Sequence, residues 1–120
     1  MSDQLTLNIE ERGEVLVAHL AGELDLAVAP RTGRRLEDAV PASALGMVVD
    51  FLELDFIDSS GVAMLFTLAR QLASRRQAIA VVVVPGSPVA RVLELVDFGR
   101  AAPVGPDLEQ AVAGVAGTLG

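Results

Sequence analysis

Apolar and polar residues alternate at the start of the chain and predict a β-hairpin. The alternation runs from Leu5 to Glu10, which places every second side chain on the same face of a strand. After Gly13 a second apolar run extends from Val15 to Leu20. Gly13 suits the turn between the two strands. We expect Gly22 to Asp25 to end the second strand.

Along the rest of the chain, segments with apolar residues at helical spacing alternate with short segments that are apolar throughout. Runs that are apolar throughout are typical of strands covered on both faces, and a proline near a helix start is tolerated because its missing N–H is not needed there. The predicted elements are a helix capped near Asp25 with Pro30 in its first turn, a strand Met47 to Phe51, a helix after Gly61, a strand Ile79 to Val84, a helix from Ser87 closed by Gly99, an edge strand around Ala101 to Val104, and a last helix from Pro106.

This order of elements predicts an α/β fold. The order is β-β-α-β-α-β-α-β-α, and right-handed crossovers leave few topologies for it. We expect residues 1–120 to form a single domain, with a mixed sheet of four to five strands and about four packed helices. A chain of 120 residues is long enough to bury a core without disulfides or metals.

Paired serines lie between the Met47 strand and the following helix. The helix is predicted from apolar residues at helical spacing: Val62, Leu65, Phe66, Ala69, Leu72 and Ala73. Ser59 or Ser60 is then the expected N-cap. A helix N-terminus carries free N–H groups and a partial positive charge, so a phosphate on a hydroxyl could be accommodated there. Most such serines only cap a helix, and position alone leaves both interpretations open.

Composition excludes several classes of function. The chain contains no cysteine, which rules out disulfides, thiolate metal sites and cysteine nucleophiles. Lysine is also absent, which removes the phosphate-loop lysine and Schiff-base chemistry. A net charge of −7 and only four aromatic residues argue against direct nucleic-acid binding. The polar start and the lack of a long apolar run predict a cytoplasmic protein that does not span a membrane.

Acidic residues near the serines allow a rival interpretation. The carboxyl ends of parallel strands meet at one edge of a sheet, so we expect Asp25, Asp50 and Ser59 to gather there. Magnesium coordination by Asp25, Asp50 and Asp58 is one alternative. A hydrolase with His19 as general base is another, but the glycine expected two residues before a nucleophilic serine is replaced by Ile57.

Three segments match a known family motif in order along the chain. The matching residues are Asp50, Phe56, Ile57, Asp58, Ser59, Ser60 and Gly61, with Gly22 to Asp25 upstream and Arg91 to Leu95 downstream. The chain thus resembles the STAS domain of bacterial anti-sigma factor antagonists. In that family the residue directly after the aspartate is phosphorylated, which implies Ser59, with Ser60 as the alternative. Relatives commonly continue with leucine and glycine, whereas this chain has Val62 and Ala63 on the helix that would contact a partner.

The resemblance implies a partner-switching cycle. An unmodified antagonist binds an anti-sigma factor that is itself a serine kinase and so releases a sigma factor; phosphorylation at Ser59 then ends binding, and a phosphatase resets the protein. The residues implied for partner binding are Asp25, Asp50, Asp58, Ser60, Gly61 and Val62. The chain would be a regulator without enzymatic activity, cofactor or metal, and a monomer when free. The alternative is a STAS scaffold or transport-accessory subunit with a fixed partner and no phosphorylation cycle.

Overall fold

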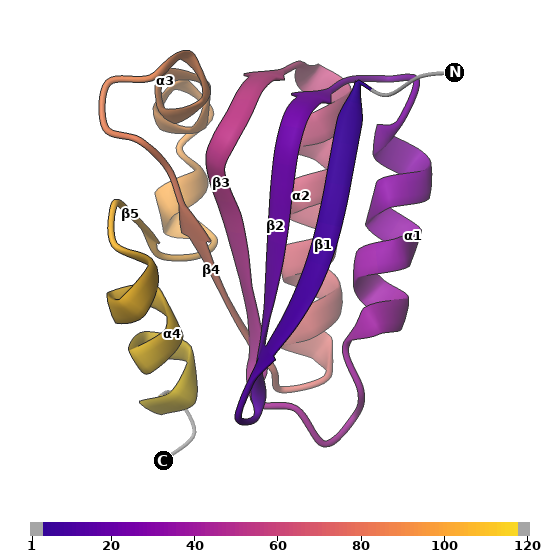
Figure 1. Ribbon diagram of the computed structural model, residues 1–120, viewed down its shortest axis with the longest axis vertical. Helices are drawn as coiled ribbons and strands as arrows, with labels where there is room; N and C mark the ends of the chain where they lie inside the picture. The colour runs from indigo at the N-terminus through magenta and orange to yellow at the C-terminus, as the bar shows by residue number, and fades with distance from the viewer. Residues whose placement is uncertain (1–3, 118–120) are drawn as a thin grey trace.

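A five-stranded mixed sheet forms the centre of the molecule, and the computed structural model describes residues 4–117 of it. The strands lie side by side in chain order: β1 Leu5–Arg12, β2 Val15–Leu24, β3 Gly46–Ile57, β4 Ala78–Val82 and β5 Val104–Gly105. β1 is antiparallel to β2, and every later pair is parallel. The predicted hairpin of β1 and β2 is confirmed (Figure 1). Gly13 lies in its turn with a φ of 63°.

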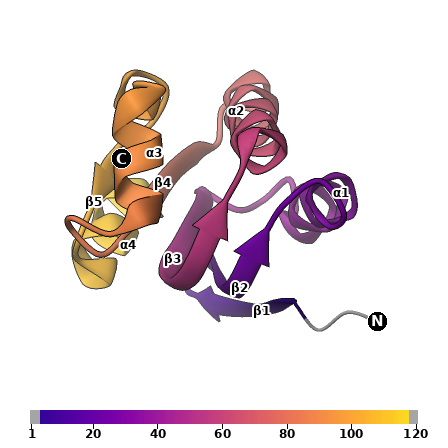
Figure 2. The ribbon, with the colours of Figure 1, turned by 90° about the horizontal axis from the view of Figure 1, so that it is seen from above.

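Within residues 4–117, four α-helices pack on this sheet. They are α1 Ala29–Ala39, α2 Ser59–Ser74, α3 Pro88–Leu95 and α4 Leu108–Gly117, with a short 3₁₀ turn at Phe98–Arg100. Figure 2 shows α1 and α2 side by side over one face of the sheet, with α4 on the other side. The predicted α/β class, element order and mixed sheet are therefore confirmed.

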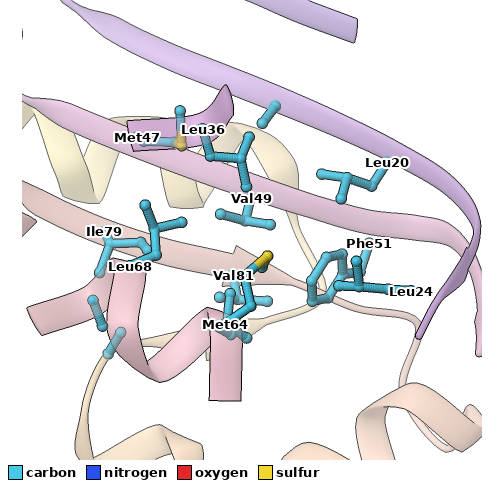
Figure 3. Packing of buried hydrophobic residues seen from close by; sticks show 14 of the residues in the cluster. Leu20, Leu24, Leu36, Met47, Val49, Phe51, Met64, Leu68, Ile79 and Val81 are labelled. Carbon is cyan, nitrogen blue, oxygen red and sulfur yellow. The ribbon is translucent and has the colours of Figure 1, made fainter. Parts of the chain in front are cut away.

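Alternation along the strands divides the apolar side chains between two cores. Val49 and Phe51 of β3 and Val81 of β4 face the larger core, where they meet Met64 and Leu68 of α2 (Figure 3). The intervening residues face α4 and form a smaller cluster: Val15, Val17, Val48, Ala80 and Val82, with Val115 of α4. The prediction that the strand from Ile79, now β4, is covered on both faces is correct because helices lie on both sides.

Two strands extend beyond their predicted ends. β2 continues through Gly22 to Leu24, and β3 continues past Phe51 to Ile57, with Leu24 paired to Ile57. Gly22 has a φ of 107°, and a Cβ there would overlap the Gln4 carbonyl, so this glycine is needed within the strand rather than at its end. The polar residues after Phe51 stay extended because each of these two strands supplies the other's hydrogen-bonding partner.

Helix boundaries also differ from the prediction. Asp25 caps a turn of its own, accepting from Ala27 N at 3.0 Å, and α1 begins only at Ala29. α3 ends at Leu95 rather than Gly99, because Asp97 adopts a left-handed φ of 58°. The predicted start of α3 is confirmed: Ser87 is its N-cap, and the Ser87 hydroxyl accepts from Ala90 N at 3.1 Å.

The C-terminal elements are shifted by a few residues. β5 is only Val104–Gly105 instead of the segment around Ala101 to Val104, and α4 begins at Leu108 instead of Pro106. Asp107 precedes that helix and accepts a hydrogen bond from Gln110 N at 3.1 Å. The end of the predicted last helix, residues 118–120, lies outside the described residues.

Candidate functional site

The turn from β3 into α2 is built around the side chain of Asp58. Asp58 is the N-cap of α2, and its Oδ1 accepts from the backbone N–H groups of Ser60 at 2.9 Å and Gly61 at 3.1 Å. The predicted N-cap at Ser59 or Ser60 is therefore wrong. A carboxylate at this position satisfies two helix-terminal donors at once and complements the helix dipole. The serines become the first two residues of the helix.

The same carboxylate joins two turns at this end of the sheet. Asp58 Oδ2 accepts from Leu26 N at 3.2 Å, and Asp58 N donates to the Leu24 carbonyl at 3.2 Å. The turn that follows Asp25 is therefore held beside the β3–α2 turn. The expectation that Asp25 and Ser59 lie at one edge of the sheet is confirmed.

The two serines differ in exposure. Ser59 is exposed, whereas Ser60 is half-buried on the side of α2 that faces α1. Within residues 4–117 neither hydroxyl forms a hydrogen bond, so neither oxygen is committed to the fold. Ser59 is the more accessible acceptor for a modifying enzyme. The assignment between the two serines stays a prediction.

Gly61 and Val62 lie beneath the turn. A Cβ at Gly61 would come within 2.7 Å of both the Leu24 carbonyl oxygen and Ile57 Cγ1, and Val62 is only 9% exposed. Close packing of α2 against the ends of β2 and β3 thus requires a glycine at position 61. These two residues shape the turn from below, and direct contact between them and a partner stays a prediction.

Asp50 lies away from this turn, in the middle of β3. It is 8% exposed, and about seven residues of strand, roughly 23 Å at the usual rise, separate it from Ile57. The expectation that Asp50 gathers with Asp25 and Ser59 is wrong because β3 does not end there. Asp50 Oδ1 instead accepts from Leu52 N at 2.8 Å, where the pairing of β3 with β2 shifts register. Asp50 thus stabilises a β-bulge.

A polar network on the α4 side of the sheet includes Asp50. His19 Nδ1 lies 2.6 Å from Asp50 Oδ2, and His19 Nε2 lies 2.7 Å from Glu10 Oε1. Arg12 then bonds Glu10 at 2.9 Å and Glu109 of α4 at 2.7 Å. One chain of contacts therefore joins β3, β2, β1 and α4.

The network shifts the ionisation of its members. Burial lowers the pKa of His19, but the hydrogen bonds to Glu10 and Asp50 outweigh this effect, so the pKa is raised overall. The hydrogen bond from His19, followed by that from Arg12, lowers the pKa of Glu10. This network was not predicted from the sequence. The alternation that puts Glu10 and Arg12 on one face of β1 was its only signal.

The arrangement of carboxylates gives no support to the magnesium alternative. Among residues 4–117 no group of three or more histidine, cysteine or acidic side chains is placed to hold a metal ion. Asp58 already accepts three backbone hydrogen bonds, and Asp50 is remote. His19 is likewise remote from the serines, because it lies opposite Asp50 in the sheet. The turn presents an exposed Ser59 hydroxyl next to a backbone that is hydrogen-bonded to the Asp58 carboxylate.

The chain matches the model of the STAS domain over residues 6–111. Because this match covers most of the chain, the protein belongs to the STAS-domain family, and its element order agrees with that assignment. The resemblance stated from the motif residues is confirmed. No curated protein sequence matches the chain closely enough to count as a relative.

Solved structures of similar fold include several anti-sigma factor antagonists. One from Mycobacterium paratuberculosis is 24% identical, with 97% of each chain covered and a TM-score of 0.84. SpoIIAA in its unphosphorylated form is 26% identical, with 93% of this chain and 99% of that chain covered and a TM-score of 0.69. A serine-to-glutamate variant of RsbS from Moorella thermoacetica is 16% identical, with 94% of this chain and 97% of that chain covered and a TM-score of 0.72. SpoIIAA of Bacillus has also been solved in a phosphorylated form.

The helices give no indication of a membrane span. In the part of the chain that the structure describes, no helix is both long enough and apolar enough to cross a bilayer.

Proposed function

We propose that the protein is an anti-sigma factor antagonist whose binding to an anti-sigma factor kinase is switched off by phosphorylation at Ser59. In its unmodified state it binds the kinase in the cytoplasm and releases a sigma factor; a phosphatase later removes the phosphate. The observation that carries the proposal is the exposed Ser59 hydroxyl directly after the Asp58 cap in a STAS fold. Antagonists solved with the same fold support it.

The surroundings of Ser59 explain how a phosphate would act. A phosphoserine adds about −1.5 to −2 charges, and the helix dipole offsets only about 0.3 to 2 kcal/mol of the cost. The N–H groups of Ser60 and Gly61 are already bonded to Asp58, so they are not free to bind the phosphate. Asp58 itself adds a neighbouring negative charge. The phosphate is therefore expected to project from the surface.

Electrostatic repulsion by a phosphate on Ser59 should affect mainly the interface with the partner. A carboxylate ~8 Å from the phosphate repels it by about 1 to 2 kcal/mol per unit charge at an effective dielectric constant of ~20–40. Acidic residues of a docked partner would repel the phosphate by similar amounts. Because Ser59 is exposed, the fold loses few contacts when it is modified. Phosphorylation should weaken binding more than it destabilises the domain.

We assign different roles to the exposed and the buried residues among those implied for partner binding. Asp25, Asp58 and Ser60 are partly exposed beside Ser59 and are proposed to face the kinase. Gly61 and Val62 act through the shape of the turn, and Asp50 acts through the β3 bulge. The protein itself acts as substrate and regulator, without an enzymatic step of its own.

Intact-mass spectrometry tests the proposal. The protein, Ser59→Ala and the matched control Ser60→Ala are each incubated with ATP and candidate anti-sigma kinases from the same genome. We expect one phosphate on the wild type and on Ser60→Ala and none on Ser59→Ala, which should still bind the kinase. Phosphate retained on Ser59→Ala but lost from Ser60→Ala would move the acceptor to Ser60. No phosphate, with complexes that persist regardless of ATP, would favour a STAS scaffold or transport-accessory subunit with a fixed partner.

A further inference from the structure

A groove of about 380 Å³ runs between α1 and α2 beside the Ser59 turn. The two helices lie next to each other along the groove (Figure 2). Pro30, Gly33 and Arg34 of α1 face Ser60, Ala63 and Thr67 of α2 across it, and its lining is mostly apolar. Its position next to Ser60 places it where an enzyme acting on Ser59 would rest on the surface.

We propose that this groove receives one amphipathic helix of the anti-sigma factor kinase, with an apolar side chain packed against Leu26 and a carboxylate paired with Arg34. The inference rests on the proposed function and adds to it the chemistry of the docking segment. Leu26 supplies the apolar contact and Arg34 the charge.

The α2 wall of the groove extends over two helical turns. The α2 residues that line it are Ser60, Ala63, Met64 and Thr67, a spacing of i, i+3, i+4 and i+7. Seven residues of α2 span roughly 10.5 Å, or two turns, and a docking helix presents its own i, i+3, i+4 and i+7 side chains over the same length. A methyl group at Gly33 would come within 2.8 Å of Met64 Cγ, so the two helices pack closely beneath this surface.

Leu26 is held in an exposed position rather than left loose. Its side chain is 70% exposed and lines the groove, while its backbone N–H is bonded to Asp58 Oδ2. The following turn is closed by bonds from Val28 N and Ala29 N to the Asp25 carbonyl. An exposed leucine on a hydrogen-bonded backbone beside an apolar groove has the character of a partner contact, because little backbone entropy is lost on binding.

The charged residues at the groove indicate which charge the docking helix should carry. Two charged residues line it, and Glu37 is already paired with Arg75, through a 4.0 Å ion pair and a 3.4 Å bond from Arg75 to the Glu37 carbonyl. Within residues 4–117 none of Arg31, Arg34 and Arg35 forms an ion pair, although all three are exposed on α1. The uncompensated charge at the groove is thus positive in a chain of net charge −7. A carboxylate on the docking helix complements it.

Binding titrations with the unmodified protein test the docking helix. Leu26→Ala and Arg34→Glu are compared with two matched controls, Leu95→Ala and Arg35→Glu. Leu95 is 84% exposed but lies on α3, and Arg35 is exposed on α1 but does not line the groove. We expect the kinase affinity to fall at least fivefold for Leu26→Ala and at least tenfold for Arg34→Glu, and less than twofold for both controls. Arg34→Gln should also reduce the salt dependence of binding.

The outcomes separate this inference from the proposed function. If the wild type binds a kinase and Leu26→Ala and Arg34→Glu bind equally well, the groove assignment is wrong while the proposed function stands. If the wild type binds no anti-sigma kinase, the proposed function is wrong and this inference fails with it. Sedimentation of the protein alone identifies another occupant: a concentration-dependent dimer lost in Leu26→Ala, with kinase binding unchanged, would assign the groove to a second copy and overturn the proposal.

Discussion

At the scale of single residues, Asp58 determines how the Ser59 turn is presented. Its carboxylate accepts from two N–H groups at the start of α2 and from one in the turn before α1, so three backbone donors in two segments share one side chain. A neutral residue that cannot accept hydrogen bonds would leave these donors without a protein partner. The first turn of α2 and the position of Leu26 depend on this acceptor.

We therefore predict that Asp58→Ala lowers the free energy of unfolding by about 1 to 2 kcal/mol, because an N-cap and the link to Leu26 are both lost. Asp58→Asn should cost less, since its amide oxygen can still accept from Ser60 N and Gly61 N. Urea unfolding followed by circular dichroism measures both. Asp107→Ala is the control: Asp107 precedes α4 and accepts one bond, from Gln110 N, so its loss should cost less than that of Asp58. Equal stability of Asp58→Ala and the wild type would contradict the role assigned to the cap.

The motif residues around Ser59 are predictable from the sequence as the start of a helix, but the cap itself is not. Aspartate and serine are both good N-caps, and three of them follow in succession from Asp58 to Ser60. Only the backbone decides which side chain faces back toward the free N–H groups. A pattern of residue types cannot carry that information.

At the scale of secondary structure, β3 is the element for which the prediction from sequence differs most from the structure. Residues 52–56 include Glu53 and Asp55, which break the apolar run and indicate a loop. The structure keeps them extended because β2 pairs with them, and it absorbs the mismatch in two register shifts. The bond from Leu52 N to Asp50 stabilises the first of these shifts, and His19 fixes the same carboxylate. Such long-range pairing is set by the tertiary fold, not by local propensity.

The His19 network predicts a dependence of stability on pH. Because its folded-state pKa is raised, protonated His19 stabilises the fold fully below the unfolded value of about 6.5, and this contribution is lost as the pH rises through the folded pKa. Glu10, whose pKa is lowered, contributes above about 4.5 and loses its contribution as the pH falls through its folded pKa. Both contributions are complete between about pH 4.5 and 6.5.

Replacing the imidazole should flatten the alkaline side of this profile. We predict that the stability difference between the wild type and His19→Gln shrinks as the pH rises from about 6 to about 9, as measured by urea unfolding across that range. His19 is the only histidine in the chain, so its NMR titration is unambiguous and should give a pKa above 6.5. A titration at or below 6.5, or a difference that grows with pH, would be incompatible with the two carboxylate contacts.

At the scale of the whole molecule, the order of elements is predictable from the sequence but the division of faces is not. Apolar runs such as Val15 to Ala18 and Met47 to Val49 are typical of strands buried on both sides, yet they do not tell which helix covers the face that carries Val15, Val17 and Val48. The structure places α4 on one side, with Val115 against these residues, and the Ser59 turn and the α1–α2 groove with the helices of the other side (Figure 2). We therefore expect that the stability of the fold and the proposed partner binding can be perturbed separately.

Val115→Ala tests this separation. Val115 is 2% exposed, and its truncation should lower the free energy of unfolding by about 1 to 3 kcal/mol through lost burial and a small cavity. Because no lining residue of the α1–α2 groove belongs to α4, phosphorylation by the kinase at a temperature well below melting should stay within twofold of the wild-type rate. Ala116→Ser, an exposed position on the same helix, serves as the control and should change neither quantity. A large loss of phosphorylation in Val115→Ala alone, with the protein still folded, would contradict this separation. It would show that the α4 side of the sheet is coupled to the Ser59 turn, and β3, which contacts α4 and leads into that turn, would be the element that transmits the change.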